Sequence, residues 1–219
     1  MTIRVLLVDD DSLVRTGLRL MFSGLPDLEI VGEAADGSEV LPLVRQHAPD
    51  VVLMDIRMPQ VDGLTATESL RARPQPPEIL VLTTFDADEH VLRALRVGAA
   101  GFLLKDTPPD EIVAAVRKVS RGDPVLSPTA TKALIRHVGG GPPDDRRSRA
   151  RDALAALGER EREVARAVAR GGSNAEIARA LHLSVPTVKT HVSRILTKLD
   201  LNNRVQIALL AYDAGEPEH

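Results

Sequence analysis

Five short apolar runs in the first 120 residues constrain the fold more than any other feature of the chain. They lie at residues 3–8, 28–32, 51–54, 78–83 and 101–105, and helix-length segments separate them. The runs are mostly apolar without strict alternation, which is typical of strands covered on both faces. Strands that alternate with helices form a parallel sheet with right-handed crossovers. The sequence therefore predicts a doubly wound α/β domain, with a five-stranded parallel sheet and a flavodoxin-like fold.

The C-terminal part of the chain has a helical pattern and no strand-like runs. A Gly pair at residues 171–172 ends one amphipathic segment, and Ser173 with Glu176 has the spacing of a capping box for the next. Ser184 is the expected N-cap of a third helix, and only two residues precede it after the second. That is turn length for a helix-turn-helix. With a last helix after residue 203, we predict an all-α four-helix helix-turn-helix domain.

A stretch rich in Gly and Pro lies between the strand-and-helix pattern of the first part and the helical pattern of the second. Residues 139–151 read GGGPPDDRRSRAR, which combines Gly and Pro with a run of charges and has no apolar period. We interpret it as a flexible linker. The expected domains are 1–121 and 153–219, with 122–152 between them.

Composition excludes several classes of function. The 219 residues include no cysteine, so disulfides, thiolate metal ligands and cysteine nucleophiles are excluded, and a cytoplasmic protein is expected. No run of about 18 apolar residues occurs, so no signal peptide or membrane span is expected. Aromatic residues make up only 2% of the chain, which disfavours binding of single-stranded nucleic acid by stacking.

Charge is distributed unevenly along the chain. The net charge is −3 overall, with −5 in residues 1–143 and +2 in residues 144–219. A mildly basic second half permits a nucleic-acid partner there without establishing one.

Polar side chains follow four of the five predicted strands. In chain order these are Asp9, Asp10 and Asp11 after the first strand, Asp55 after the third, Thr83 at the end of the fourth, and Lys105 at the end of the fifth. In a doubly wound sheet these ends meet at the edge where ligands bind. Converging carboxylates need a cation, and oxygen ligands select a hard ion such as Mg²⁺.

The same residues suggest a covalent reaction. With a cation in place, the Asp55 carboxylate can attack phosphorus and form an aspartyl phosphate, while Lys105 neutralises charge on the phosphoryl oxygens and Thr83 offers a hydroxyl. A single Asp at a strand end is more often a helix N-cap, and Asp11 fits that role. The hypothesis of an aspartyl phosphate rests on the combination of residues at four strand ends.

These residues also carry a resemblance to a known family. The segments VLLVDDD, DIRMPQVDG, VLTTFD and GAAGFLLKD, within about residues 3–121, resemble the receiver domain of two-component response regulators. The resemblance implies that Asp55 is the phosphoacceptor and that Thr83 and Lys105 contact the phosphoryl group. It implies an Mg²⁺ site formed by Asp9, Asp10, Asp55 and the backbone carbonyl of Arg57, and a switch made of Thr83 with Phe102, which reorients on activation.

The third C-terminal helix has two distinct faces on a helical wheel. Its apolar side chains cluster on one side, and the opposite face carries, in order, Pro186, Thr190, Ser193, Arg194 and Thr197, with Lys189 on the flank. Small hydroxyls with nearby cations suit a helix in the DNA major groove. Composition alone favours an ordinary solvent-exposed face.

The surrounding sequence decides between these interpretations by a second resemblance. Residues 155–212 are similar to the LuxR-type helix-turn-helix, and its pairing with a receiver matches the NarL/FixJ family. The resemblance implies a DNA-binding surface, and the residues assigned to it are Ser184, Thr187, Lys189, Thr190, Ser193, Arg194, Lys198 and Arg204. It also implies that the last helix helps the protein dimerise.

The resulting prediction is a DNA-binding response regulator that is not an enzyme. A sensor histidine kinase phosphorylates Asp55, which controls dimerisation and binding of double-stranded DNA at paired half-sites. Two alternatives stay open. One is a constitutive regulator whose receiver is an unphosphorylated scaffold. The other is an aspartyl-phosphate phosphatase, although such enzymes carry a second Asp two residues after the nucleophile, where this chain has Arg57.

Overall fold

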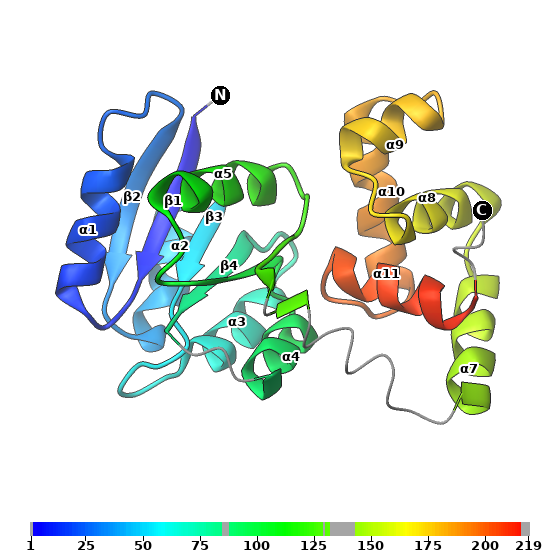
Figure 1. The fold of residues 1–219 in the computed structure, drawn as a ribbon, viewed down its shortest axis with the longest axis horizontal. Coiled ribbons are helices and arrows are strands. Elements are labelled where there is room, and N and C mark those ends of the chain that lie inside the picture. The colour runs from blue at the N-terminus through cyan, green and yellow to red at the C-terminus, as the bar shows by residue number, and fades with distance from the viewer. Residues whose placement is uncertain (1, 85–87, 129, 132–142, 216–219) are drawn as a thin grey trace. The chain divides into compact units, whose positions relative to one another are not determined.

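The computed structural model describes residues 2–84, 88–128, 130–131 and 143–215. The chain divides into two compact units, Met1–Ala133 and Leu134–His219. The first unit contains a parallel sheet with helices on both faces, and the second contains helices (Figure 1).

The sheet of the first unit is parallel throughout, in the order β2-β1-β3-β4-β5-β6. Its main strands are β1 (Ile3–Val8), β2 (Leu28–Ala34), β3 (Val51–Met54), β4 (Glu78–Thr83) and β5 (Gly101–Leu104). All five coincide with the predicted apolar runs to within two residues. The chain runs from β1 outward to β2 and then returns to β3 on the other side of β1. The switch point of this doubly wound sheet therefore lies between β1 and β3.

A sixth strand, β6 (Val125–Leu126), extends the sheet beyond the five that the sequence predicts. It has two residues and pairs parallel to β5 at Gly101 and Phe102. Two residues are too few to produce a recognisable apolar run, so only pairing in the folded sheet defines this strand.

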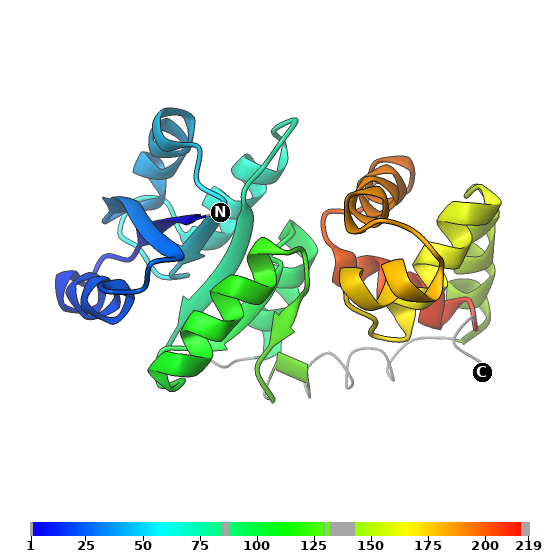
Figure 2. The same cartoon turned by 90° about the horizontal axis from the view of Figure 1, so that it is seen from above.

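Helices cover both faces of the sheet, as Figures 1 and 2 show. The helices are α1 (Ser12–Phe22), α2 (Val40–His47) after a short 3-10 turn η1 (Gly37–Glu39), α3 (Gly63–Arg71), α4 (Asp88–Val97) and α5 (Pro109–Ser120). Side chains of α1 and α5 pack with Leu7 and Leu53 in one cluster. Those of α2 and α3 pack with Leu6 and Met54 in a second cluster on the other face. Because both faces are buried, the strands are apolar at consecutive positions.

The second unit is all helical. Its helices are α7 (Pro143–Ala155), α8 (Glu159–Ala169), α9 (Asn174–Ala180), α10 (Val185–Lys198) and α11 (Arg204–Asp213). The predicted caps are present, because Ser173 and Glu176 form a capping box and the Ser184 side chain accepts from the Thr187 amide. One core, which includes Val168, Ile177 and Ile195, joins these helices.

Residues 143–151 differ from the expected flexible linker, because they belong to α7. Ala150 and Leu154 are buried in the helical core, and the Arg151 guanidinium donates to the carbonyl of Ala214 at 3.2 Å. The sequence gives little sign of this helix because only a narrow apolar stripe faces the core and charged residues occupy the rest. Pro143 at its first position is compatible with a helix start. Residues 139–142 lie outside the described residues.

None of the described helices is both long and apolar enough to cross a membrane.

Candidate functional site

The carboxyl ends of the central strands bring the predicted polar residues of the first unit together. Asp9 and Asp10 follow β1 directly, and Asp55 follows β3, its neighbour in the sheet. Lys105 follows β5, two strands from β3. The strand order thus places these side chains at the switch point, although they are up to 96 positions apart in the sequence.

Lys105 contacts two of the carboxylates. Its Nζ lies 2.6 Å from Oδ2 of Asp9 and 2.9 Å from Oδ2 of Asp55. Asp9 and Asp55 are only 2% and 6% exposed, whereas Asp10 is exposed. The site therefore has a buried floor made by two carboxylates and a lysine, and one carboxylate that faces solvent.

Backbone amides fix the orientation of both buried carboxylates. Oδ1 of Asp55 accepts from the Ile56 amide at 2.7 Å, and Oδ1 of Asp9 accepts from the Asp11 amide at 3.0 Å. Asp11 caps α1, as predicted, by accepting from the Leu13 amide at 2.8 Å. The side chain of Asp11 is thus directed to the helix and the other carboxylates to the site.

Burial and pairing change the proton affinities at this site. Burial raises the pKa of Asp9 above its usual range, and the hydrogen bonds from Lys105 and Asp11 offset only part of the effect. Burial alone would lower the pKa of Lys105, but its hydrogen bonds to Asp9 and Asp55 outweigh burial and raise that pKa. The lysine is therefore a fixed positive charge at neutral pH.

The three carboxylates fit a divalent cation. Ligand oxygens of Asp9, Asp10 and Asp55 lie within 4.8 Å of one another, and the donor set contains only oxygen. Oxygen ligands suit Mg²⁺ rather than softer metals.

The other predicted residues of this unit lie on β4 and β5 or in the loop after β3. Thr83 ends β4, is fully buried, and its carbonyl accepts from the Lys105 amide at 2.8 Å. Arg57 is exposed in the loop after β3, and Phe102 is a fully buried side chain of β5.

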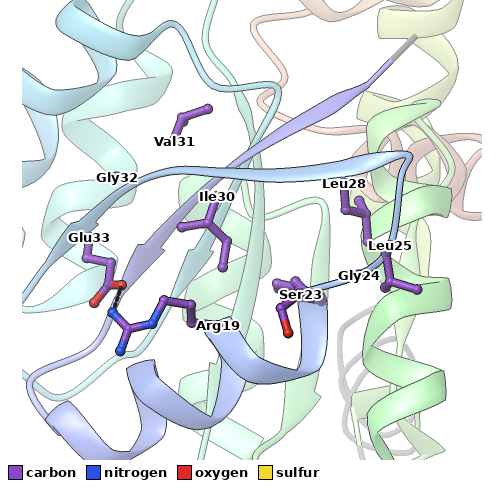
Figure 3. Close-up of a pocket in the computed structure, with 10 residues that line it drawn as sticks. Arg19, Ser23, Gly24, Leu25, Leu28, Ile30, Val31, Gly32 and Glu33 are labelled. Atoms are coloured by element: carbon purple, nitrogen blue, oxygen red, sulfur yellow. Dashed lines mark hydrogen bonds and ion pairs between the residues drawn. The ribbon is translucent and has the colours of Figure 1, made fainter.

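A groove elsewhere on this unit has a different character. It has a volume of about 420 Å³ between α1 and β2, and its lining includes Leu25 and Ile30. Arg19 pairs with Glu33 at 3.0 Å among these residues (Figure 3). None of the predicted site residues lines it.

In the second unit, α10 presents the face that the sequence predicts. Val188 and Ile195 are buried, whereas Pro186, Lys189, Thr190, Ser193, Arg194 and Thr197 are exposed. Pro186 lies in the first turn, where its missing N–H costs no helical hydrogen bond. The Ser184 and Thr187 hydroxyls lie 2.7 Å apart at the start of α10. The helix thus has an apolar inner side and an outer side of hydroxyls and cations.

Two family models match the chain, one in each unit. Residues 5–117 match the response regulator receiver domain, and residues 155–211 match the luxR family of bacterial regulatory proteins. The chain belongs to the NarL/LiaR/VraR family of response regulators. It is a two-component, DNA-binding transcriptional regulator rather than an enzyme, which removes the phosphatase alternative.

Relatives of this response regulator match it along nearly the whole chain. The transcriptional regulatory protein LiaR of Bacillus subtilis is 40% identical over 96% of this chain and 97% of LiaR. The response regulator VraR of Staphylococcus aureus is 39% identical over 97% of each chain. Among solved structures, response regulator ChrA of a heme-sensing two-component system is 36% identical over 98% of each chain, with a TM-score of 0.53.

Two residues predicted to contact DNA have protein partners in this regulator. Lys198 Nζ lies 2.7 Å from Oε2 of Glu161, and Arg204 is 8% exposed, donating to Asn174 Oδ1 at 2.7 Å and to the Gly172 carbonyl. These contacts join α10 to α8, and the start of α11 to the turn before α9. Because Arg204 is buried, we correct its expected role to a structural one. The Lys198 side chain remains 49% exposed, so its contact with DNA stays a prediction.

Two residues that contact the loop after Asp55 were not among the predicted site residues. They are Asp36, which bonds to the Gln60 amide, and Gly63, which bonds to the Ile56 carbonyl. Each belongs to an Asp-Gly pair, at 36–37 and 62–63, which indicates a turn but not what the turn contacts.

Proposed function

We propose that Asp55 is the phosphoacceptor of this response regulator and that a sensor histidine kinase is the donor. The observation that carries the proposal is the buried Asp55 carboxylate, held 2.9 Å from Lys105 and beside the oxygens of Asp9 and Asp10. A carboxylate in this position is oriented, partly desolvated and next to a fixed positive charge. These are the requirements for a carboxylate nucleophile.

In the proposed step, a carboxylate oxygen of Asp55 forms a bond to phosphorus while the bond from phosphorus to the donor breaks. The donor is a phosphohistidine nitrogen of the kinase or the acyl oxygen of a small molecule such as acetyl phosphate, and the electron pair leaves with that atom. Lys105 stabilises the negative charge on the phosphoryl oxygens, and the Thr83 hydroxyl contacts the same group.

Asp9, Asp10, Asp55 and the backbone carbonyl of Arg57 would hold Mg²⁺. When bound, the ion supplies positive charge that offsets repulsion between the carboxylates and the phosphoryl oxygens. Thr83 and Phe102 then act as the switch that reports phosphorylation.

The proposed output is DNA binding by paired α10 helices of a cytoplasmic homodimer. Residues at or near the start of α10 and on its outer face support contact with bases and phosphates. These are Ser184, Thr187, Lys189, Thr190, Ser193 and Arg194, all exposed except the half-buried Thr187. Lys198, which is exposed as well as bonded to Glu161, is proposed to contact the DNA backbone, and Arg204 is left out because it is buried.

The decisive test of the phosphoacceptor is mass spectrometry of the intact chain with acetyl phosphate and Mg²⁺. The wild-type mass is expected to rise by one phosphate, and the Asp55→Asn mass is expected to stay unchanged. Omission of Mg²⁺ should prevent the rise. Labelling that persists in Asp55→Asn would place the nucleophile at another residue, and a wild type that is never labelled would favour the alternative of a scaffold receiver.

A further inference from the structure

Asp36, a carboxylate outside the acidic site, holds the loop that follows Asp55. It lies after β2 and is 6% exposed. Its Oδ2 accepts from the Gln60 amide at 2.8 Å, and both of its oxygens lie 3.3 Å from the Val61 amide. Its Oδ1 also accepts from the Ser38 amide at 2.9 Å. One carboxylate therefore joins its own turn to a loop 24 residues away.

The ionisation of Asp36 is consistent with this role. Hydrogen bonds from the Ser38 and Gln60 amides hold the pKa of Asp36 at about 2, although burial acts in the opposite direction. The group is therefore a carboxylate, able to accept from several donors, at any pH at which the protein functions.

Gly37 brings the two backbones into direct contact beside this carboxylate. Its amide donates to the Val61 carbonyl at 3.1 Å. A Cβ at position 37 would lie 2.5 Å from that carbonyl oxygen, which is too close for any side chain. The turn at 36–37 is thus seated against the end of the loop.

The loop has a second anchor at Gly63. The Gly63 amide donates to the Ile56 carbonyl at 2.8 Å, and a Cβ there would lie 1.8 Å from the Asp55 carbonyl oxygen. Between the two anchors, Arg57, Pro59 and Gln60 are exposed and Met58 is half-buried. Met58 and Val61 also pack against the second hydrophobic cluster. The path of the loop therefore depends on this packing together with the hydrogen bonds at Asp36, Gly37 and Gly63.

We propose that Asp36 is a positioning residue for magnesium, which acts through the backbone of Gln60 and Val61 to place the Arg57 carbonyl at the acidic site. This inference rests on the proposed function, which includes that carbonyl among the ligands. Without the contact, the backbone at Gln60 and Val61 has more conformational freedom, and the entropy cost of ordering it when the ion binds reduces affinity. Groups that orient metal ligands from outside typically alter metal affinity 10–100-fold.

The test is titration calorimetry of Mg²⁺ into the full-length chain, with Asp36→Ser as the variant. A serine hydroxyl can still accept from the Ser38 amide but is too short to reach Gln60 and Val61. Asp27→Asn is the matched control. It removes a carboxylate of the same unit that pairs with Arg117 at 2.7 and 2.8 Å and contacts nothing in the loop.

We expect Asp36→Ser to bind Mg²⁺ about tenfold or more weakly than wild type, and Asp27→Asn to bind with wild-type affinity. Circular dichroism checks that each variant is folded. If Asp36→Ser does not fold, Asp36→Asn, which keeps one carbonyl oxygen, takes its place. Wild-type affinity in the folded Asp36 variant would overturn the positioning role and leave the acidic site intact. Failure of wild type itself to bind Mg²⁺ would overturn the proposed site and this inference with it.

Discussion

Asp36 and Asp55 show how position changes the behaviour of one residue type. Both are buried carboxylates that follow strands of the same sheet. The two oxygens of Asp36 accept hydrogen bonds from backbone amides of its own turn and of a second loop. Asp55 has one oxygen on the Ile56 amide and the other beside Lys105, at an edge that can admit a ligand. The oxygens of Asp36 are therefore occupied by backbone hydrogen bonds, and Asp36 holds the loop in place. Asp55, in contrast, can react.

The low pKa of Asp36 predicts a pH-dependent contribution to stability. Its folded pKa of about 2 lies below the value of about 3.9 expected in an unfolded chain. The carboxylate therefore stabilises the fold fully above about pH 4, and its contribution is lost as pH falls toward 2. We expect Asp36→Asn to be less stable than wild type at pH 7, by a margin that shrinks below pH 4. Urea unfolding from pH 7 to pH 2.5 measures that margin, and a constant margin would contradict the assigned pKa.

At the scale of elements, α10 has an inner side that fixes its position and an outer side that is available to DNA. Glu161 of α8 is 7% exposed and accepts from Lys198 at 2.7 Å and from the Gly158 amide at 3.0 Å. These bonds hold the pKa of Glu161 below its usual range. One carboxylate thus provides an acceptor for the amide of the N-cap residue of α8 and ties α8 to the end of α10.

Removal of this carboxylate should destabilise the helical unit. We expect Glu161→Ala to cost on the order of 2 kcal/mol, because it leaves the Gly158 amide and the Lys198 ammonium without this acceptor. Glu163→Ala is the control, since that residue makes an exposed pair with Arg160 and should cost no more than about 0.5 kcal/mol. Calorimetry of the full chain should show a shift of the helical unit's transition alone. Equal effects of both substitutions would contradict the role of Glu161.

The outer side of α10 should divide into residues that read bases and residues that do not. Lys189→Ala is expected to cost about 1–3 kcal/mol on the operator and less on random DNA. Thr190→Ala and Ser193→Ala should alter base preference and leave the salt dependence nearly unchanged, because they remove no charge. Lys198→Ala should weaken binding to both DNAs alike and lower the salt slope by about one unit per lost phosphate contact. Binding isotherms over a salt series test all four variants. Equal losses on both DNAs for Lys189→Ala, Thr190→Ala and Ser193→Ala would mean that this face does not read sequence.

At the scale of the whole molecule, the response regulator must convert phosphorylation in one unit into DNA binding by the other. Recognition of half-sites requires two α10 helices at a fixed spacing, which a dimer provides. We therefore expect beryllofluoride, a mimic of the phosphoryl group, to double the mass measured by light scattering. Asp55→Asn should remain a monomer under the same conditions. A wild type that stays monomeric yet gains DNA affinity would instead favour release of the helical unit from the receiver.

The sequence by itself determined the two fold classes, because each rests on local patterns. Consecutive apolar positions define strands buried on both faces, and caps such as Ser173 and Ser184 define helix starts within a few residues. The acidic site was also predictable, since parallel strands direct Asp9, Asp55 and Lys105 to one edge whatever the details of packing.

Tertiary structure alone decided which polar groups have partners. The bonds of Asp36 to Gln60, of Glu161 to Lys198 and of Arg204 to Asn174 span 24 to 37 residues and follow no periodic pattern. Strand β6 and helix α7 likewise depend on contacts with β5 and α11 rather than on strong local signals. Long-range contacts of this kind arise only when the elements pack, so local sequence patterns do not reveal them.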